Sequence, residues 1–307
     1  MGADWIGDYA PVSEIDLRNH SQRVGAVDAL NWVTTFATGV ENGASRQVCR
    51  DSEGRSVSHI LGALSGIRKY IRAEIPLIFV YDGKISSEIR QMTDPNRSTK
   101  DTPYPQTKFY KRSLTQVLDA LGIPSVMDYP FDGDAGAAML NSEGYADFVL
   151  SDDWDPLLFG AETQIRNFTG RDPEELVHRR ALEQETGCSR EELIDVAIIV
   201  GTDYNDGLRN MSAASAFDAL SMYGSLEAVY DRRTEDLPEI VDDLRELFLQ
   251  PPSFEGVNST LLENPPIPNP DLSHLKTLME EYEIPSERIS EEISALERTM
   301  DRSSDPN

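Results

Sequence analysis

The chain has 307 residues, with 54 acidic against 28 basic side chains and a formal net charge of −26 at pH 7. Its length is sufficient for a complete α/β core with appendages. In most proteins such acidity would argue against a nucleic-acid partner, but a halophilic protein is the alternative interpretation. Molar salt shortens the Debye length to about 3 Å, so that only close charge contacts count. The acidic composition is therefore informative about the salt concentration around the protein and says less about whether it binds nucleic acid.

The cysteine content and the hydropathy limit which cellular compartment the protein is expected to occupy. The two cysteines, Cys49 and Cys188, lack the spacing of a metal site and suit a reducing compartment. No apolar run reaches membrane-spanning length, and residues 1–6 lack the charged start and the apolar stretch of a signal peptide. We therefore expect a cytoplasmic protein without membrane contacts.

Two apolar runs in the first third of the chain predict buried parallel strands, because they are short, rich in β-branched residues and separated by a helical pattern. They are residues 23–28, which end in Asp28, and residues 77–82, which end in Asp82. Between them, residues 56–71 carry apolar side chains at helical spacing, which predicts a crossover helix.

A basic segment, residues 84–112, follows Asp82 in this otherwise acidic chain. It holds seven Lys or Arg against three Asp or Glu, a net charge of +4. A solvated loop is one interpretation, but the position directly after Asp82 favours a segment that contacts phosphate. Its prolines exclude a long helix before residues 108–121, where the helical pattern resumes.

Three later segments supply further aspartates. Residues 131–141 predict a helix packed through small side chains. Acids lie in its first turn, where the positive end of the helix dipole stabilises carboxylates. Residues 148–155 and 196–203 predict two more core strands. The acids that these three segments place beside the strand ends are Asp132, Asp134, Asp153, Asp155 and Asp203.

The predicted strand ends would gather these acids at one edge of the sheet, because ligands of open α/β sheets lie beyond the carboxyl ends of the strands. Such a cluster repels itself unless cations lie within it, and divalent metal ions are the obvious ones. Each aspartate taken singly is equally compatible with a turn former or a helix N-cap. Four apolar runs that each end in aspartate, taken together with two Asp-x-Asp pairs, favour a metal site. The four histidines lie outside these segments, so no Ser/His/Asp arrangement competes.

Paired metal ions suit one difficult reaction, the cleavage of a phosphodiester. One ion activates water and a second, about 4 Å away, stabilises the leaving oxygen. Mg²⁺ takes hard oxygen ligands and keeps several waters, so that two ions need several carboxylates. Seven aspartates are sufficient for such a centre.

Four segments carry a family resemblance in addition to their acids. Residues 26–31, 79–84, 151–160 and 200–207 resemble, in the right order, the signature segments of the flap endonucleases, the XPG-type structure-specific 5′ nucleases. The similarity spans roughly residues 2–300. The acidic composition suggests a divergent haloarchaeal member.

The resemblance implies an α/β fold with a mostly parallel central sheet flanked by helices, a PIN-like nuclease core, and a helical C-terminal region. It implies a two-metal nuclease that cuts DNA at flaps, gaps or ends, with two Mg²⁺ ions or with Mn²⁺ in their place. Around the first metal it places Asp28, Asp82, Asp132 and Asp134. Around the second it places Asp153, Asp155 and Asp203, with Asp134 bridging the two.

The resemblance also implies contacts to DNA that has a junction of single and double strands. These positions are Gly2, Lys84, Arg90, Arg97, Lys108, Lys111, Arg112, Gly207 and Arg209. The nuclease core would span residues 1–250, with a short arch at 84–112 and a degenerate helix-hairpin-helix at 203–222. Residues 251–307 would form a C-terminal extension whose helices, at 271–282 and 286–300, pack on the core. We expect a monomer.

Several positions depart from the family pattern. The family's Glu-x-Glu pair is Asp132-Gly133-Asp134 here, one methylene shorter at each acid, so the helix must shift or water must fill the gap. The family's base-stacking aromatic falls at Thr34, and Trp32 is either its substitute or a core residue. In the hairpin, Asn210 and Ser212 replace glycines that would let the backbone approach phosphate.

Two other departures concern length and partners. Only 39 residues separate Asp82 from Gly122, fewer than the family's helical arch requires. Residues 298–307 lack the family's clamp-binding motif, so we expect no recruitment by a sliding clamp through a C-terminal motif.

Two alternatives to a flap-type nuclease stay open on the sequence. One is a catalytically weak paralogue that binds branched nucleic acid or a protein partner, which the altered pair, the short arch and the hairpin favour. All seven acids argue against it, since such a repulsive cluster has little use without catalysis. The other is a PIN-type nuclease acting on RNA, which fits the acidic strand ends but not the long C-terminal half.

Overall fold

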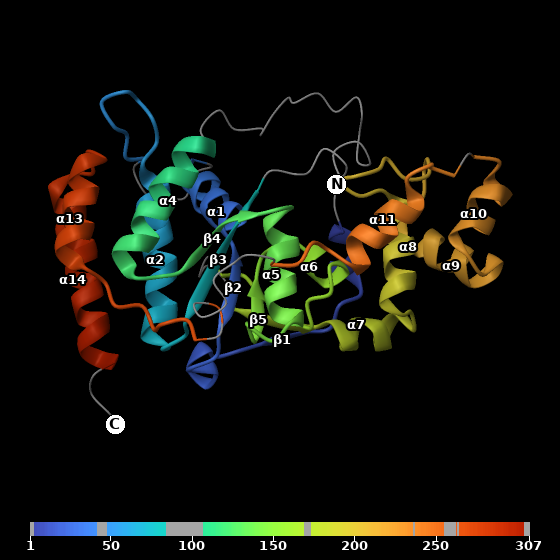
Figure 1. Ribbon diagram of the computed structural model, residues 1–307, viewed down its shortest axis with the longest axis horizontal. Coiled ribbons are helices and arrows are strands. Elements are labelled where there is room, and N and C mark those ends of the chain that lie inside the picture. Colours follow the sequence, from blue (N-terminus) through green and yellow to red (C-terminus); the bar gives the residue numbers. More distant parts are fainter. Residues whose placement is uncertain are drawn as a thin grey trace.

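A seven-stranded sheet organises the computed structural model, which describes residues 3–41, 48–83, 107–168, 173–235, 237–254, 262 and 264–303 (Figure 1). The strand order is β1-β7-β6-β5-β2-β3-β4. The five strands from β6 to β4 in this order run parallel, and β7 and β1 complete the sheet in antiparallel pairs. The bounds are β1 (Val12–Glu14), β2 (Gly25–Asp28), β3 (Leu77–Asp82), β4 (Ser125–Tyr129), β5 (Phe148–Leu150), β6 (Thr163–Arg166) and β7 (Glu175–His178). The predicted mostly parallel α/β sheet is confirmed.

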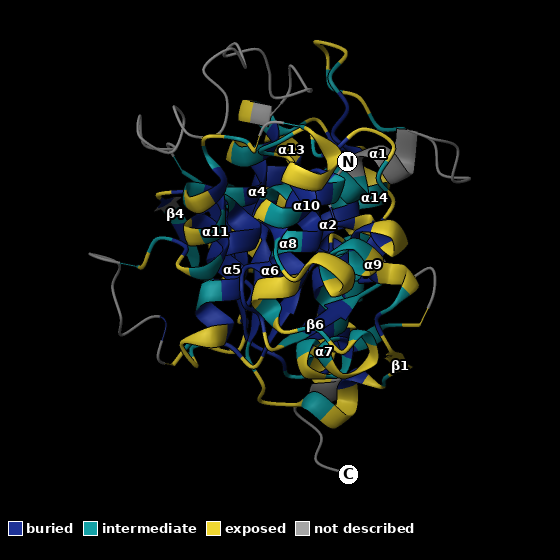
Figure 2. Ribbon diagram, turned by 90° about the vertical axis from the view of Figure 1, so that its right-hand side faces the viewer, coloured by how far each residue is buried: buried dark blue, intermediate teal, exposed yellow. Residues whose placement is uncertain are grey.

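Helices cover both faces of this sheet. On one face lie α1 (Ala29–Glu41), α2 (Ser58–Arg72), α4 (Thr107–Leu121), α13 (Leu272–Glu281) and α14 (Ser286–Ser303). On the other face lie α5 (Gly133–Ser142) and α6 (Asp155–Leu158), which contact the strands. Helix α8 (Arg190–Val200) packs against α6, and α9 (Ala213–Tyr223), α10 (Leu226–Arg233) and α11 (Val241–Leu249) pack against α8. The remaining helical elements are η1 (Asp4–Asp8), η2 (Leu17–His20) and α7 (Arg179–Thr186). Buried residues concentrate at the centre of the molecule (Figure 2).

The alternation of side chains along β2 and β3 decides where their terminal acids point. Val27 and Phe79 pack into the core beneath α1 and α2, whereas Ala26 and Val80 pack into the core beneath α5. Successive strand residues point to opposite faces, so Asp28, two residues after Ala26, lies on the α5 face. Asp82, two residues after Val80, does the same. Asp28 pairs in register with Val80, which places the two acids at one sheet edge.

Residues 196–203, predicted as a core strand, are helical instead up to Val200, because they complete α8. A capping box at its start, formed by Ser189 and Glu192, directs the chain into a helix. Residues Val196 to Ile199 are all buried, since α8 contacts α6, α9, α10 and α11. A short apolar run buried on all sides does not distinguish a helix from a strand. Asp203 therefore follows a helix and not a strand.

The C-terminal region is helical, as expected. Helix α14 packs on α2, and α13 packs on α4. At the left of Figure 1 the two helices stand together beside α2. Among the residues that the structure describes, no helix is both long and apolar enough to cross a membrane.

Candidate metal centre

The ends of β2 and β3 hold their carboxylates by backbone hydrogen bonds. Asp28 Oδ1 accepts from the N–H groups of Leu30 and Asn31, at 2.7 and 2.9 Å, in the first turn of α1. Asp82 Oδ1 accepts from Gly133 N–H at 2.8 Å, at the start of α5. Strand ends and helix starts therefore fix both acids at one place.

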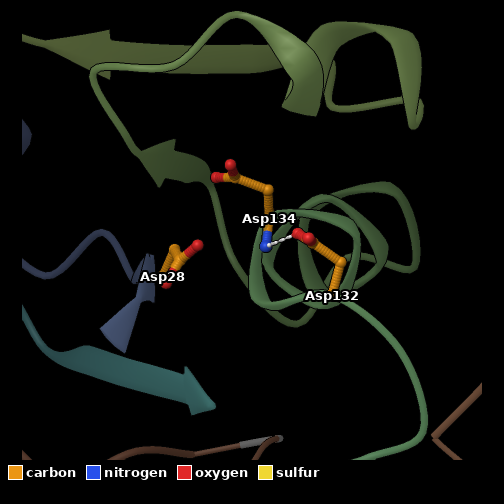
Figure 3. Close-up of side chains that lie close together, drawn as sticks. All are labelled: Asp28, Asp132 and Asp134. Carbon is orange, nitrogen blue, oxygen red and sulfur yellow. Dashed lines mark hydrogen bonds between the residues drawn. The ribbon is translucent and has the colours of Figure 1, made fainter. Parts of the chain in front are cut away.

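The first residues of α5 bring two more carboxylates to the same place. Asp132 is the N-cap, and its Oδ1 accepts from Asp134 N–H at 2.9 Å. Ligand oxygens of Asp28, Asp132 and Asp134 all lie within 4.8 Å of one another. Figure 3 shows this triad, with Asp28 at the end of β2 and the other two at the start of α5. Such a group of oxygens could bind a metal ion.

The remaining three acids come from the segments after β5 and after α8. Asp153 Oδ2 accepts from the side-chain amide of Asn31 at 2.5 Å, and Asp155 Oδ1 accepts from Ala3 N–H at 3.1 Å. Asp153 lies in the turn after β5, whereas Asp155 is the first residue of α6. Asp203 lies close enough to Asp155 to raise the pKa of Asp155.

Burial and repulsion between carboxylates raise the pKa values of Asp132, Asp134 and Asp155. Burial, followed by the charge of Asp82, raises the pKa of Asp132 to about 7. Burial and the neighbouring Asp203 raise the pKa of Asp155 to about 6. The pKa of Asp134 is raised well above its usual value by burial first and then by Asp28 and Asp132, with Asp153 and Asp155 adding to it. The seven predicted acids therefore lie near enough to influence one another electrostatically, and the pKa of Asp134 is raised by Asp28 and Asp132 as well as by Asp153 and Asp155.

The cluster has the properties of a cation site. Asp28 and Asp134 are only 6% and 7% exposed, and Asp134 Oδ1 is buried without a hydrogen-bond partner. Asn31 Oδ1 is likewise buried without one, and its amide orientation is set because Asp153 needs the NH₂ group. Hard oxygens that lack donors, within repelling carboxylates, fit a hydrated divalent ion. The residues present therefore fit the metal that the sequence implied.

The positions proposed to contact DNA are more dispersed. Gly2, Lys84, Arg90 and Arg97 lie outside the described residues. Lys108 and Arg112 are exposed on α4, and Arg209 is exposed in the loop before α9. The predicted arch lies mostly in residues 84–106, which are also outside the described residues.

Two predicted DNA contacts have structural partners of their own. The Lys111 ammonium donates to the backbone oxygens of Asp82 and Met127, at 3.2 and 3.3 Å, and so connects the end of β3 to the middle of β4. At Gly207, which has φ +68°, a Cβ would lie 2.4–2.6 Å from the backbone of Val200 and Gly201. This glycine therefore serves the packing of its loop against the end of α8.

The structure decides between the two interpretations of Trp32. Its side chain is fully buried and stacks on Phe168, with ring centroids 4.7 Å apart and planes 7° apart. Thr34 donates its hydroxyl to Leu30 O on the same helix. Trp32 is thus a core residue and not a substitute for the stacking aromatic.

Sequence reasoning missed two residues that shape the site. Asn31 connects Asp28 to Asp153, and its signal was its position three residues after a strand-ending acid. Arg166 lies over the ring of Trp154, 3.7 Å from its centroid, and donates to Asp153 O at 3.1 Å. It stabilises the turn that carries Asp153 and Asp155, and nothing in its sequence context indicates this.

Comparisons with known proteins identify the family of the chain. The family model described as XPG I-region matches residues 122–203. Flap endonuclease 1 of Methanothrix thermoacetophila is 33% identical over 292 residues, covering 83% of this chain and 85% of its own. Flap endonuclease 1 of Haloquadratum walsbyi is 26% identical over 325 residues, covering 98% and 97%.

Solved structures share the fold. Flap endonuclease-1 from Methanococcus jannaschii has a TM-score of 0.75 at 21% identity and covers 97% of this chain and 99% of its own. The Holliday junction-resolving enzyme GEN1, in complex with product DNA and a Mg²⁺ ion, has a TM-score of 0.67 at 19% identity, with coverages of 96% and 76%. The chain belongs to the flap endonuclease family of structure-specific nucleases.

Proposed function

We propose that this protein hydrolyses DNA phosphodiester bonds at flaps, gaps or ends, with two Mg²⁺ ions that Mn²⁺ can replace. The observation that carries the proposal is the triad of Asp28, Asp132 and Asp134. Burial and neighbouring carboxylates raise the pKa values of these three acids, so their negative charges need a cation to balance them. The GEN1 structure with product DNA and a Mg²⁺ ion supports the choice of metal and substrate.

The seven acids divide into two sets that share one residue. Asp28, Asp82 and Asp132 would hold the first ion, and Asp153, Asp155 and Asp203 the second. Asp134 would be the shared residue, and the rise of its pKa through carboxylates of both sets supports this assignment. Bound there, the ions would supply an activated water and a counter-charge for the leaving oxygen.

The residues around these acids would orient them. Backbone N–H groups at the starts of α1 and α5 hold Asp28 and Asp82, and the Asn31 amide holds Asp153. Each of these bonds uses one carboxylate oxygen and leaves the other for the ion. On the substrate side, the exposed side chains of Lys108 and Arg112 on α4 would contact phosphate oxygens, close to Lys111 and the end of β3.

A second candidate is a weak paralogue that binds branched nucleic acid or a protein partner. The loop after α8 favours it, because Gly207 packs against its own chain and Ser212 caps α9 instead of leaving backbone open to phosphate. In this case DNA binding would occur without turnover.

One experiment separates the two functions. The full chain is incubated at molar KCl with labelled flap, gapped, single-stranded and RNA substrates, with EDTA, Mg²⁺ or Mn²⁺. We expect metal-dependent cleavage of the DNA flap or gap. Binding without cleavage of any substrate, at protein in excess, contradicts the proposal and supports the paralogue. Cleavage of RNA alone would indicate a PIN-type activity.

A further inference from the structure

Strand β6 places a fully buried amide beside the turn that carries Asp153. This residue, Gln164, pairs in register with Val149 of β5 and with Val177 of β7. Both valines belong to the apolar core on the α5 face, and side chains that pair in register share a face of the sheet. Gln164 therefore lies in an apolar layer, where a polar side chain is costly unless it forms hydrogen bonds.

The amide group of Gln164 binds the main chain of this turn at two points. Its Nε2 donates to the backbone oxygen of Ser151 at 2.8 Å and to that of Asp153 at 2.5 Å. Arg166, two residues further along β6 and on the same face of the sheet, donates to the same Asp153 oxygen at 3.1 Å. A carbonyl oxygen has two lone pairs, so these two donors saturate it and fix the backbone of Asp153.

Gln164 acts on a different part of Asp153 than Asn31 does. Asn31 orients the carboxylate, whereas Gln164 holds the peptide group of the same residue. Asp155 follows two residues later, as the first residue of the one-turn helix α6. A shift of the turn would therefore displace Asp153 and Asp155 together.

The side-chain oxygen of Gln164 has no partner among the residues that the structure describes. This Oε1 atom is buried. The amide cannot be turned to satisfy it, because the two backbone oxygens require the NH₂ group on their side. An oxygen buried without a donor lowers stability, which a side chain serving only the fold would avoid. Local losses of this kind are expected where a residue serves a functional site.

We propose that Gln164 is a positioning residue for the second ion, the one that Asp153, Asp155 and Asp203 would hold. Through the backbone of residues 151–153 it keeps the first two of these acids in place. Its hydrogen bonds within the described part of the chain reach this segment and not the acids of the first ion. The effect of Gln164 is therefore confined to one of the two ions. The inference rests on the proposed function, since it concerns the same metal centre.

The test compares Gln164 with a second buried amide that lies away from the turn. Gln164→Met keeps the unbranched shape of the side chain and removes its donor. Asn141→Leu is the matched control, because the amide of Asn141, in α5, is also buried and also binds main-chain groups. Its partners are Ala146 O and the N–H groups of Glu162 and Thr163.

A second variant, Gln164→Asn, keeps a polar group that can bind one of the two backbone oxygens. Its amide reaches about 1.5 Å less far, so it cannot bind both at once. Mn²⁺ binding to the full chain is measured by isothermal titration calorimetry at molar KCl. Folding is checked by circular dichroism and the melting temperature in EDTA, and cleavage of a flap substrate is followed over a range of Mn²⁺ concentrations.

We expect Asn141→Leu to melt at a lower temperature and to bind two ions as tightly as the unchanged protein does. Gln164→Met and Gln164→Asn should bind the first ion unchanged and the second at least about tenfold more weakly. Cleavage by these variants should recover at high Mn²⁺, because all seven acids are still present. A residue that served only the fold would lower the melting temperature and leave the affinity for the second ion unchanged.

Three results overturn the inference by itself. One is a folded Gln164→Met or Gln164→Asn protein that binds both ions as tightly as the unchanged protein. Another is an equal weakening of both ions in these variants. The third is an equal loss of the second ion in Asn141→Leu, because the loss would then follow from lower stability alone. If the unchanged protein binds no Mn²⁺ at all, the proposed function fails together with this inference.

Discussion

The side-chain amide of Asn31 lies 2.5 Å from Asp153 Oδ2, while its backbone N–H lies 2.9 Å from Asp28 Oδ1. One residue in the first turn of α1 therefore orients an acid from each half of the cluster. Its Oδ1 is buried without a partner, and a metal-bound water would satisfy it. Residues that orient metal ligands in this way commonly matter almost as much as the ligands.

Asn31→Ala should therefore lower Mn²⁺ affinity by about 10–100-fold. The reason is that Asp153 loses its donor and becomes free to turn away from the ion. Calorimetric titration with Mn²⁺ measures the effect, and Asn19→Ala, at an exposed position, is the control. Unchanged affinity in Asn31→Ala would show that Asp153 is held by its other neighbours.

Neighbouring aspartates offer a matched pair for the cleavage reaction. Asp153 belongs to the cluster, whereas Asp152 accepts from Asn167 N–H at 2.7 Å and lies near Lys69. Asp153→Ala should reduce cleavage by more than about 100-fold, the upper end of what an outer-shell change costs. Asp152→Ala should keep cleavage and lose about 1–3 kcal/mol of unfolding free energy. Equal losses of cleavage in the two variants would contradict this assignment.

The metal-free protein should become less stable as the pH rises towards neutrality. Burial and neighbouring carboxylates raise the pKa values of Asp132 and Asp155 to about 7 and about 6, whereas unfolded aspartates ionise near about 3.9. Between these values the folded state binds more protons than the unfolded state, so the free energy of unfolding falls with increasing pH.

Melting temperatures in EDTA, measured between about pH 5 and about pH 8, check this prediction. Asp132→Asn should flatten the dependence, because asparagine keeps the N-cap and cannot ionise. Mg²⁺ added at neutral pH should restore the lost stability, since it compensates the ionised acids. A melting temperature that rises with pH throughout this range in EDTA would be the contrary result.

Trp32 should matter for folding and not for substrate stacking. Its ring is fully buried and stacks on Phe168, so Trp32→Ala should cost about 3–5 kcal/mol of unfolding free energy. Trp32→Phe should keep an unchanged KM for a flap substrate. Chemical denaturation and steady-state kinetics measure the two effects. A raised KM in a stably folded Trp32→Phe protein would revive the stacking interpretation.

Much of the fold was predictable because strands β2 and β3 and helices α2 and α4 carry clear periodic patterns. The prediction failed at α8, where an apolar run surrounded by other helices has the composition of a buried strand. Strand β4 escaped prediction because Ser125 and Asp128 interrupt its short apolar pattern.

The sequence by itself determined which acids this protein offers and which two strand ends present Asp28 and Asp82, because residue type and local periodicity are properties of the chain. Only the tertiary structure decided that Asp203 follows a helix, that Asn31 holds Asp153, and that Gly133 lies against two carboxylates. The contact between Asn31 and Asp153 joins residues 122 positions apart, and it depends, like that of Gly133, on how closely helices and strands pack. No local pattern encodes such distances, and they are what turns seven acids into a candidate metal centre.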